Sequence, residues 1–179
     1  RRARAGDAAR LAARRRRVGG GAERLEADVE AFKAKGAEIA DVYIATMFRH
    51  HDRRITIPGW DDYAKGHHKA HGVPNMVSEL GFKEGIVTTG NSLDFNDTDM
   101  KIMKENEATV KDMEAAAIAW VCEQARTPFF AMKVVTDIVD GGVATHEEFM
   151  ANLGKAAQSL QLNLLRMIDY MVGKNVSEL

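Results

Sequence analysis

Apolar and polar residues follow one another along the chain in patterns that predict strands separated by helices. Short runs rich in β-branched residues predict strands at 39–46, 85–89 and 108–113. Stretches of helix-forming residues predict helices at 75–80, 97–106 and 114–126. Segments 47–75 and 90–97 are rich in turn-forming residues and predict irregular loops. This alternation of strand and helix is typical of an α/β fold.

The C-terminal third predicts one more strand and a long helix. Residues 129–136 are almost all apolar, which predicts a strand buried on both faces of a parallel or mixed sheet. Thr145 and Glu148 have the spacing of a capping box at a helix start. The helix that follows has one apolar stripe, formed by Phe149, Leu153, Ala156, Leu160, Leu164, Ile168 and Met171. Four strands cannot cover these apolar elements from both sides, so the pattern indicates part of a larger sheet.

The first 24 residues differ in composition from the rest. They hold nine arginines against two acidic residues, consist mainly of Arg, Ala and Gly, and are expected to be disordered or marginally helical. Three interpretations stay open: an organelle transit peptide, a basic tail attracted to nucleic acid, and foreign sequence joined to a partial gene. We favour the third. The remaining chain has more acidic than basic residues, which argues against a nucleic-acid-binding body.

The composition also bears on the compartment. No apolar run reaches the roughly 18 residues of a membrane span, so no membrane partner is expected. The single cysteine, Cys122, excludes a disulfide framework and favours a reducing, cytoplasmic location. Because Cys122 lies in an apolar helical stretch, we expect it in the core rather than as a nucleophile.

Two acidic residues stand where α/β folds place ligands. Asp137 follows the apolar run 129–136, and Glu114 stands between a predicted strand and a helix. Desolvation at a strand end favours the protonated form of a carboxyl group, which suits a general acid. A glutamate at a helix start has a structural alternative, because the helix dipole stabilises it there without any function.

Five histidines lie in the segment 47–75: His50, His51, His67, His68 and His71. Their spacing completes no known zinc pattern, and we expect surface loop histidines without a metal.

Several motifs together resemble the nucleoside phosphorylase superfamily, and within it the plant-type 5'-methylthioadenosine/S-adenosylhomocysteine nucleosidases. The motifs are TGNSLD (89–94), MEAAAIAWV (113–121) and VVTDIVDGG (134–142). FKAKGAEIADVYIAT, HDRRITIPGWDDY, the TxEEF helix start and the tail VGKNVSEL fit in the same order. The similarity runs from about Phe32 to Leu179.

The resemblance implies a role for individual residues. Asp137 matches the acid that protonates purine N7, and Thr136 matches a small hydroxyl residue near the purine. Glu114 matches the glutamate that binds the ribose hydroxyls, and Met113 matches a residue packed under the ribose. Leu93 matches the segment that lines the adenine pocket, partly through backbone groups. No cofactor is implied.

The resemblance also implies a fold and a subunit arrangement. The fold is a three-layer α/β/α nucleoside phosphorylase-like domain with a mixed central sheet. The loop around Phe48, Ile57 and Pro58 matches a segment that reaches into the alkylthio pocket of a neighbouring subunit, as in a homodimer.

The match begins in mid-domain. We therefore expect two parts: residues 1–31, unrelated to the family, and residues 32–179, a partial domain whose N-terminal half is missing. The missing half includes the carboxylate that positions the attacking water. Three functions stay open: hydrolysis of 5'-methylthioadenosine to adenine and 5-methylthioribose, a purine nucleoside phosphorylase, and a non-catalytic truncated homologue that acts by interaction.

Overall fold

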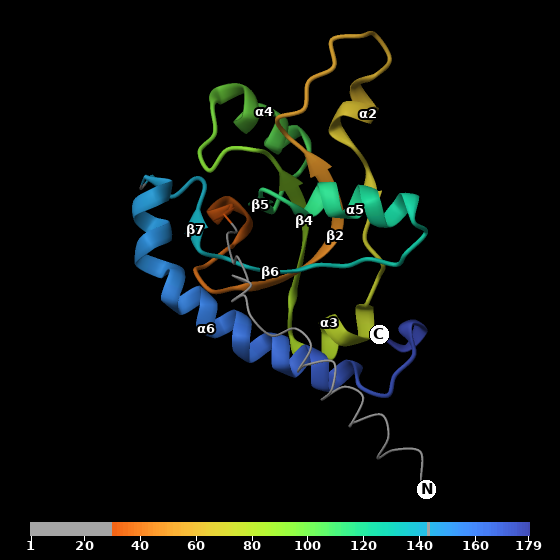
Figure 1. The fold of residues 1–179 in the computed structure, drawn as a ribbon. Helices are drawn as coiled ribbons and strands as arrows, with labels where there is room; N and C mark the ends of the chain where they lie inside the picture. The colour runs from red at the N-terminus through yellow and green to blue at the C-terminus, as the bar shows by residue number, and fades with distance from the viewer. Residues whose placement is uncertain (1–29, 143) are drawn as a thin grey trace, which may run out of the picture.

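The computed structural model describes residues 30–142 and 144–179 (Figure 1). The expectations for residues 1–24 lie outside the described residues, and the domain boundary after residue 31 stays a prediction. The first described element, β1, ends at Ala31 and pairs with two strands of the sheet.

A mixed sheet forms the centre of the fold. Its strands are β1 (Glu30–Ala31), β2 (Val42–His50), β3 (His68–Lys69), β4 (Lys83–Thr89), β5 (Val110–Asp112), β6 (Met132–Val134) and β7 (Asp137–Ile138). The strand order is β3-β2-β4-β5-β1-β7, with β6 also paired to β2. Strands β2, β4 and β5 run parallel, whereas β3 and β6 pair antiparallel with β2.

Helices lie on both faces of this sheet. They are η1 (Lys33–Lys35), α2 (Asp61–Lys65), α3 (Pro74–Leu80), α4 (Asp97–Glu105), α5 (Ala115–Gln124), α6 (Thr145–Met171) and η2 (Val176–Glu178), where η denotes a 3-10 helix. Helix α5 crosses one face, and α6 runs along the other beside α3 (Figure 1). Among the described residues, no helix is both long enough and apolar enough to cross a membrane.

The two faces of β2 belong to two different cores. Tyr43 and Phe48 pack with the α5 alanines, whereas Ile44 packs with residues of α3 and α6. Tyr43 and Phe48 differ by an odd number of positions, so a regular strand would place them on opposite faces. The register to β4 shifts between Ala45 and Met47, and this bulge turns Phe48 to the same face as Tyr43.

Alanine allows α5 to approach the sheet closely. Ala115, Ala116 and Ala119 are buried against β2 and β4, while larger residues of α5 point outward. On the opposite face, Met167, Tyr170 and other α6 residues cover the second core. Two packed layers over one sheet confirm the three-layer α/β/α prediction.

Most predicted elements are confirmed with shifted ends. Helices α3, α4, α5 and α6 and strands β4 and β5 stand where the sequence predicts them. The predicted strand 39–46 begins later and continues to His50. The prediction of an irregular segment 47–75 is wrong, because that segment includes the end of β2 and also α2 and β3.

The apolar run 129–136 does not form one long strand. Only Met132–Val134 is a strand, it is antiparallel to β2, and Phe129 is half-buried beside Phe48. Apolar content alone could not distinguish a strand from an extended segment whose aromatic side chain packs in the core. The capping-box prediction is also wrong: Ala144 is the N-cap of α6, and the Glu148 carboxylate accepts the Ile138 N–H at 2.7 Å.

Phe48 is the largest fully buried side chain of the core, and its ring centroid lies 5.1 Å from that of Phe129. Phe48→Ala should lower the free energy of unfolding by about 3–5 kcal/mol, because it leaves a cavity that the strand cannot fill. Urea denaturation measures the loss. Leu162→Ala, at a position 62% exposed, is the control and should change stability by less than about 0.5 kcal/mol. Equal losses in the two variants would contradict this account of the core.

Candidate functional site

Three parallel strands end side by side at one edge of the sheet. The register pairs His50 of β2 with Thr89 of β4, and Thr89 with Asp112 of β5. All three residues are buried. Open α/β sheets bind ligands at the carboxyl ends of their strands, so this edge is the candidate site.

Asp112 organises the end of β5 and the start of α5. Its Oδ1 accepts the Thr89 hydroxyl at 2.5 Å, and its Oδ2 accepts the Ala115 N–H at 3.0 Å. Thr89 Oγ1 in turn accepts the Ala116 N–H at 2.9 Å. Two of the N–H groups at the helix start therefore bond to side chains of two neighbouring strands.

A buried ion pair ties this network to a distant part of the chain. The Lys133 ammonium contacts Asp112 Oδ2, and the two side chains are 14% and 0% exposed. Lys133 is in β6, four residues before Asp137, and Asp112 stands two residues before Glu114. The ion pair thus holds together the two segments that carry the sequence-predicted acids.

The sequence-predicted site residues follow the two partners of this ion pair in the chain: Thr136 and Asp137 come after Lys133, and Met113 and Glu114 come after Asp112. Thr136 and Asp137 are fully buried, and the Thr136 hydroxyl donates to Asp137 Oδ1 at 2.7 Å. Asp137 opens β7 instead of ending a strand, which corrects the sequence prediction. Lys111 of β5 and Asp137 both pair with Glu30, so β1 separates the two strands.

Glu114 and Met113 follow β5 directly and are half-buried. Glu114 occupies the N-cap position of α5, but its side chain makes no cap hydrogen bond. Asp112 fills that role. Glu114 nevertheless stands at the start of α5, where the helix dipole stabilises a carboxylate, so the structural alternative for Glu114 stays open.

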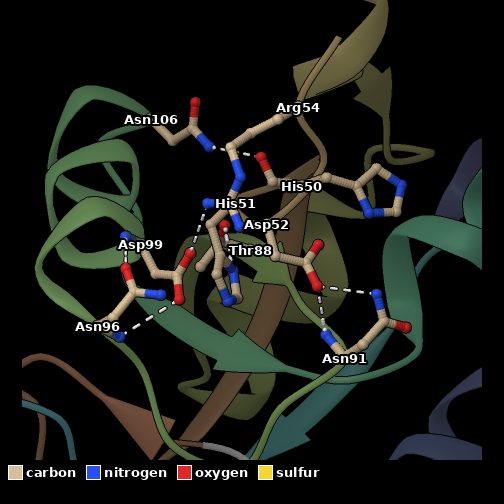
Figure 2. A network of polar contacts seen from close by, with 9 residues as sticks. All are labelled: His50, His51, Asp52, Arg54, Thr88, Asn91, Asn96, Asp99 and Asn106. Atoms are coloured by element: carbon tan, nitrogen blue, oxygen red, sulfur yellow. Dashed lines mark hydrogen bonds and ion pairs between the residues drawn. The ribbon is translucent and has the colours of Figure 1, made fainter.

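Figure 2 shows a polar network at the two ends of the loop that follows β4: Asn91 contacts Asp52, and Asn96 contacts Asp99. In this network, Asp52 Oδ2 accepts both the backbone and the side-chain N–H of Asn91, at 2.6 and 2.8 Å. Beneath the loop, Lys111 donates to the carbonyl groups of Ser92 and Leu93 at 3.1 and 2.7 Å. Sequence reasoning identified Leu93 but missed Asp52 and Lys111.

The three residues expected in one loop are separated. Phe48 is a core residue of β2, so its predicted loop position is wrong. Ile57 and Pro58 lie in the exposed loop between β2 and α2, as expected, and Ile57 is 56% exposed. That loop extends beyond the sheet edge in Figure 1.

The prediction of surface histidines is wrong for His50 and His51, which are 7% and 2% exposed. Burial, and then the charge of Arg53, lower the pKa of His50 from its ordinary 6.5 to about 4. Burial and the nearby Lys111 charge lower the pKa of His51. His51 Nδ1 lies 3.2 Å from the Thr88 hydroxyl.

Neither a metal cluster nor a core cysteine is found where the structure is described. Across residues 30–142 and 144–179, no group of three His, Cys, Asp or Glu side chains could hold a metal ion. Cys122 is only partly buried and lines a cavity of about 290 Å³ between β3 and α5, so its predicted core position is wrong.

Some of the missed residues carry a signal in the sequence. Lys111 and Lys133 interrupt apolar runs that otherwise predict strands, and a buried lysine needs a polar partner. Asp112 stands two residues before the predicted helix 114–126, close to where capping residues are common. No local signal identifies the partners, since Lys133 and Asp112 are far apart in sequence.

The comparisons with known proteins agree with this architecture. The sequence model of the phosphorylase superfamily matches residues 31–169. The chain belongs to the phosphorylase superfamily. Membership confirms the resemblance seen in the sequence motifs and the expected fold class.

Two relatives within the phosphorylase superfamily are nucleosidases of Arabidopsis thaliana. The chain is 44% identical over 148 residues to a 5'-methylthioadenosine/S-adenosylhomocysteine nucleosidase and 42% identical to a 5'-methylthioadenosine nucleosidase. These alignments cover 83% of this chain but 58% and 55% of the relatives. The chain thus spans little more than half the length of the relatives it matches.

Solved structures of the phosphorylase superfamily give the same picture. The chain superimposes on the apo form of the Arabidopsis thaliana 5'-methylthioadenosine nucleosidase with a TM-score of 0.82 and 41% identity. That match covers 84% of this chain and 62% of the solved one. A Helicobacter pylori nucleosidase, at 21% identity and a TM-score of 0.66, shares the fold.

Loss of the buried cation Lys133 should destabilise the fold more than loss of an exposed paired lysine. Lys133→Met should lower the free energy of unfolding by about 3–5 kcal/mol, because it leaves the Asp112 charge buried without its cation. Lys83→Met is the matched control: Lys83 pairs with Asp41 at 2.6 Å, but its side chain is 45% exposed. The control should lose less than about 1 kcal/mol. Urea denaturation compares the two, and similar losses would refute the importance of the Lys133–Asp112 pair.

The low pKa of His50 predicts a pH-dependent stability. In the unfolded chain the pKa returns to about 6.5, so below that pH the unfolded state binds a proton that the folded state does not. Folding stability is therefore lost as the pH falls from 6.5 toward 4. Between pH 7.5 and 5.5 the contribution of His50 is about 1 kcal/mol.

His50→Gln should remove that part of the pH dependence. Urea titrations of the wild type and the variant at both pH values measure it. An unchanged difference between pH 7.5 and 5.5 in the variant would show that His50 is not the group responsible.

Proposed function

We propose that this chain carries the purine-binding and proton-donating part of a 5'-methylthioadenosine nucleosidase, which needs no cofactor. The observation that supports this most is the fully buried Thr136–Asp137 pair beside the edge where β2, β4 and β5 end. The relatives' names, which refer to 5'-methylthioadenosine and S-adenosylhomocysteine, support the substrate class. 5'-Methylthioadenosine itself is the substrate that we propose.

The proposed reaction is acid-assisted hydrolysis of a glycosidic bond. Asp137 donates a proton to N7 of the purine, the C1'–N9 bond breaks, and its electron pair stays on N9, so that neutral adenine leaves. Water then supplies hydroxide to C1', yielding 5-methylthioribose, and its remaining proton passes to a base. Proton exchange with solvent restores the acid form of Asp137. The Thr136 hydroxyl occupies one oxygen of Asp137 and fixes the orientation of the carboxyl group.

Glu114 and Met113 are proposed to hold the sugar. A carboxylate beside the ribose hydroxyls stabilises the positive charge that develops on the ring as the bond breaks. Glu114 follows β5 at the start of α5, two residues after Asp112, which places it at the candidate edge of the sheet. By the resemblance, the base for the water comes from a part of the family domain that this chain's match does not reach.

We also propose that the chain pairs with a second copy of itself through a face between α2 and α5. Large apolar side chains are exposed there: Ile57, Trp60, Tyr63, Ile118, Trp120 and Val121. Tyr63 and Trp120 line one common cavity, which makes the face continuous. The homodimer implied by the resemblance supports this choice of partner. The cytoplasmic location that the single cysteine favours stays a prediction.

The assay for this function measures adenine released from 5'-methylthioadenosine by the purified 179-residue chain, together with the molar mass of the active fraction. Asp137→Asn should lower release by about 10²–10⁴-fold, because the amide keeps the size but has no transferable proton. Glu114→Gln should lower turnover while the affinity for free adenine stays the same.

The other two functions predict different results. Release that depends on inorganic phosphate would favour a phosphorylase. A chain that releases no adenine yet binds a full-length homologue would favour the non-catalytic role. Adenine release by Asp137→Asn within threefold of the wild type would refute the assignment of the acid.

A further inference from the structure

The loop 90–93 is held by hydrogen bonds with three neighbouring residues, Asp112, Asp52 and Lys111. Gly90 donates its N–H to the Asp112 carbonyl at 3.1 Å, and a Cβ at Gly90 would lie only 2.1 Å from His51 Nε2. Glycine is therefore required where the loop leaves β4. The imidazole of His51 closes this side of the loop.

The next residue is held by a carboxylate. Asp52 Oδ2 accepts two hydrogen bonds from Asn91, one from its backbone and one from its side chain (Figure 2). Asn91 itself is exposed, so these bonds do not arise from burial of Asn91. Asp52 thus sets the direction in which the loop continues.

The last two residues are held from below by a lysine. Lys111 is 1% exposed, and its ammonium donates to the consecutive carbonyl groups of Ser92 and Leu93. Burial of a charged ammonium group is costly unless hydrogen bonds compensate for the lost water. The two carbonyl groups provide such compensation for Lys111. Lys111 fixes both peptide groups.

The orientation of these peptide groups has a chemical consequence. In a trans peptide the N–H points opposite to the carbonyl, and the described residues include no cis peptide bond. With both carbonyls directed at Lys111, the N–H groups of Leu93 and Asp94 point to the other side of the loop. Adjacent N–H donors suit the ring-nitrogen acceptors of a purine.

We infer that Lys111 and Asp52 are positioning residues that hold loop 90–93 in a purine-accepting shape before any ligand binds. The inference rests on the proposed function for the identity of the ligand, but the holding of the loop stands on the contacts alone. Neither residue touches the purine. Both act through the loop backbone, so they should govern affinity for the free base as much as for a nucleoside.

The test measures two properties of the full chain. Isothermal titration gives the affinity for free adenine, and hydrogen exchange with mass spectrometry gives the protection of peptides that span 90–95 without ligand. The variants are Lys111→Met and Asp52→Ala, with Asp52→Asn as the conservative variant that keeps an acceptor oxygen. Lys83→Met is the matched control, because Lys83 also donates to a backbone carbonyl, that of Gly36, away from the loop.

Lys111→Met and Asp52→Ala should each weaken adenine binding about tenfold, since a loop that is competent one-tenth of the time binds one-tenth as well. Both should also speed exchange in the 90–95 peptides at a temperature where each variant is folded. Asp52→Asn should recover most of both effects, and Lys83→Met should change neither.

Two failures are distinguishable. If the wild type binds no adenine, the proposed function fails for this chain, and exchange in the loop still decides the inference. If Lys111→Met and Asp52→Ala leave loop exchange and adenine affinity within twofold of the wild type, the inference is wrong. Should Lys111→Met not fold, the Asp52 pair of variants decides alone.

Discussion

The buried contact between Lys133 and Asp112 is the interaction on which the candidate site depends. Two opposite charges removed from water are tolerated only where hydrogen bonds fill the remaining oxygen positions, and Thr89 and the Ala115 N–H do so here. Because Lys133 belongs to the strand that leads to Asp137, and Asp112 stands two residues before Glu114, the pair joins the two segments that carry these acids. An apolar replacement of both charges could match the stability but would leave the start of α5 without its cap.

The parallel strands explain why the polar residues gather at one edge. Strands β2, β4 and β5 end together, so the residues that follow them enter one region although they are far apart in sequence. The bulge in β2 adjusts this arrangement, because it returns Phe48 to the α5 face before the strand reaches His50. The same nine-residue strand therefore packs against α5 through Phe48 and ends with His50 at the candidate site.

Much of the fold was predictable because local patterns decide it. The periodicity of 145–171 and the alanine content of 114–126 gave the helices, and the motifs around Glu114 and Asp137 gave the family. The apolar run 129–136 misled, since Phe129 packs its ring against Phe48 and only Met132–Val134 pairs with β2 as a strand. The burial of His50 and His51 also escaped prediction, because it depends on where β2 ends. Lys111 and Asp52 act on a loop reached only through the folded sheet, so spacing could not show their role.

The hydrogen bond between residue 76 and residue 179 sets an order of events during synthesis. The Leu179 carbonyl accepts the Met76 N–H at 2.7 Å, and Leu179 itself is buried in the core that Met76 shares with Ile44. Helix α3 thus receives its final contacts from a residue made about a hundred positions later. While a ribosome is still adding those positions, the face of the early strands that α6 and Leu179 cover in the finished fold stays exposed to water.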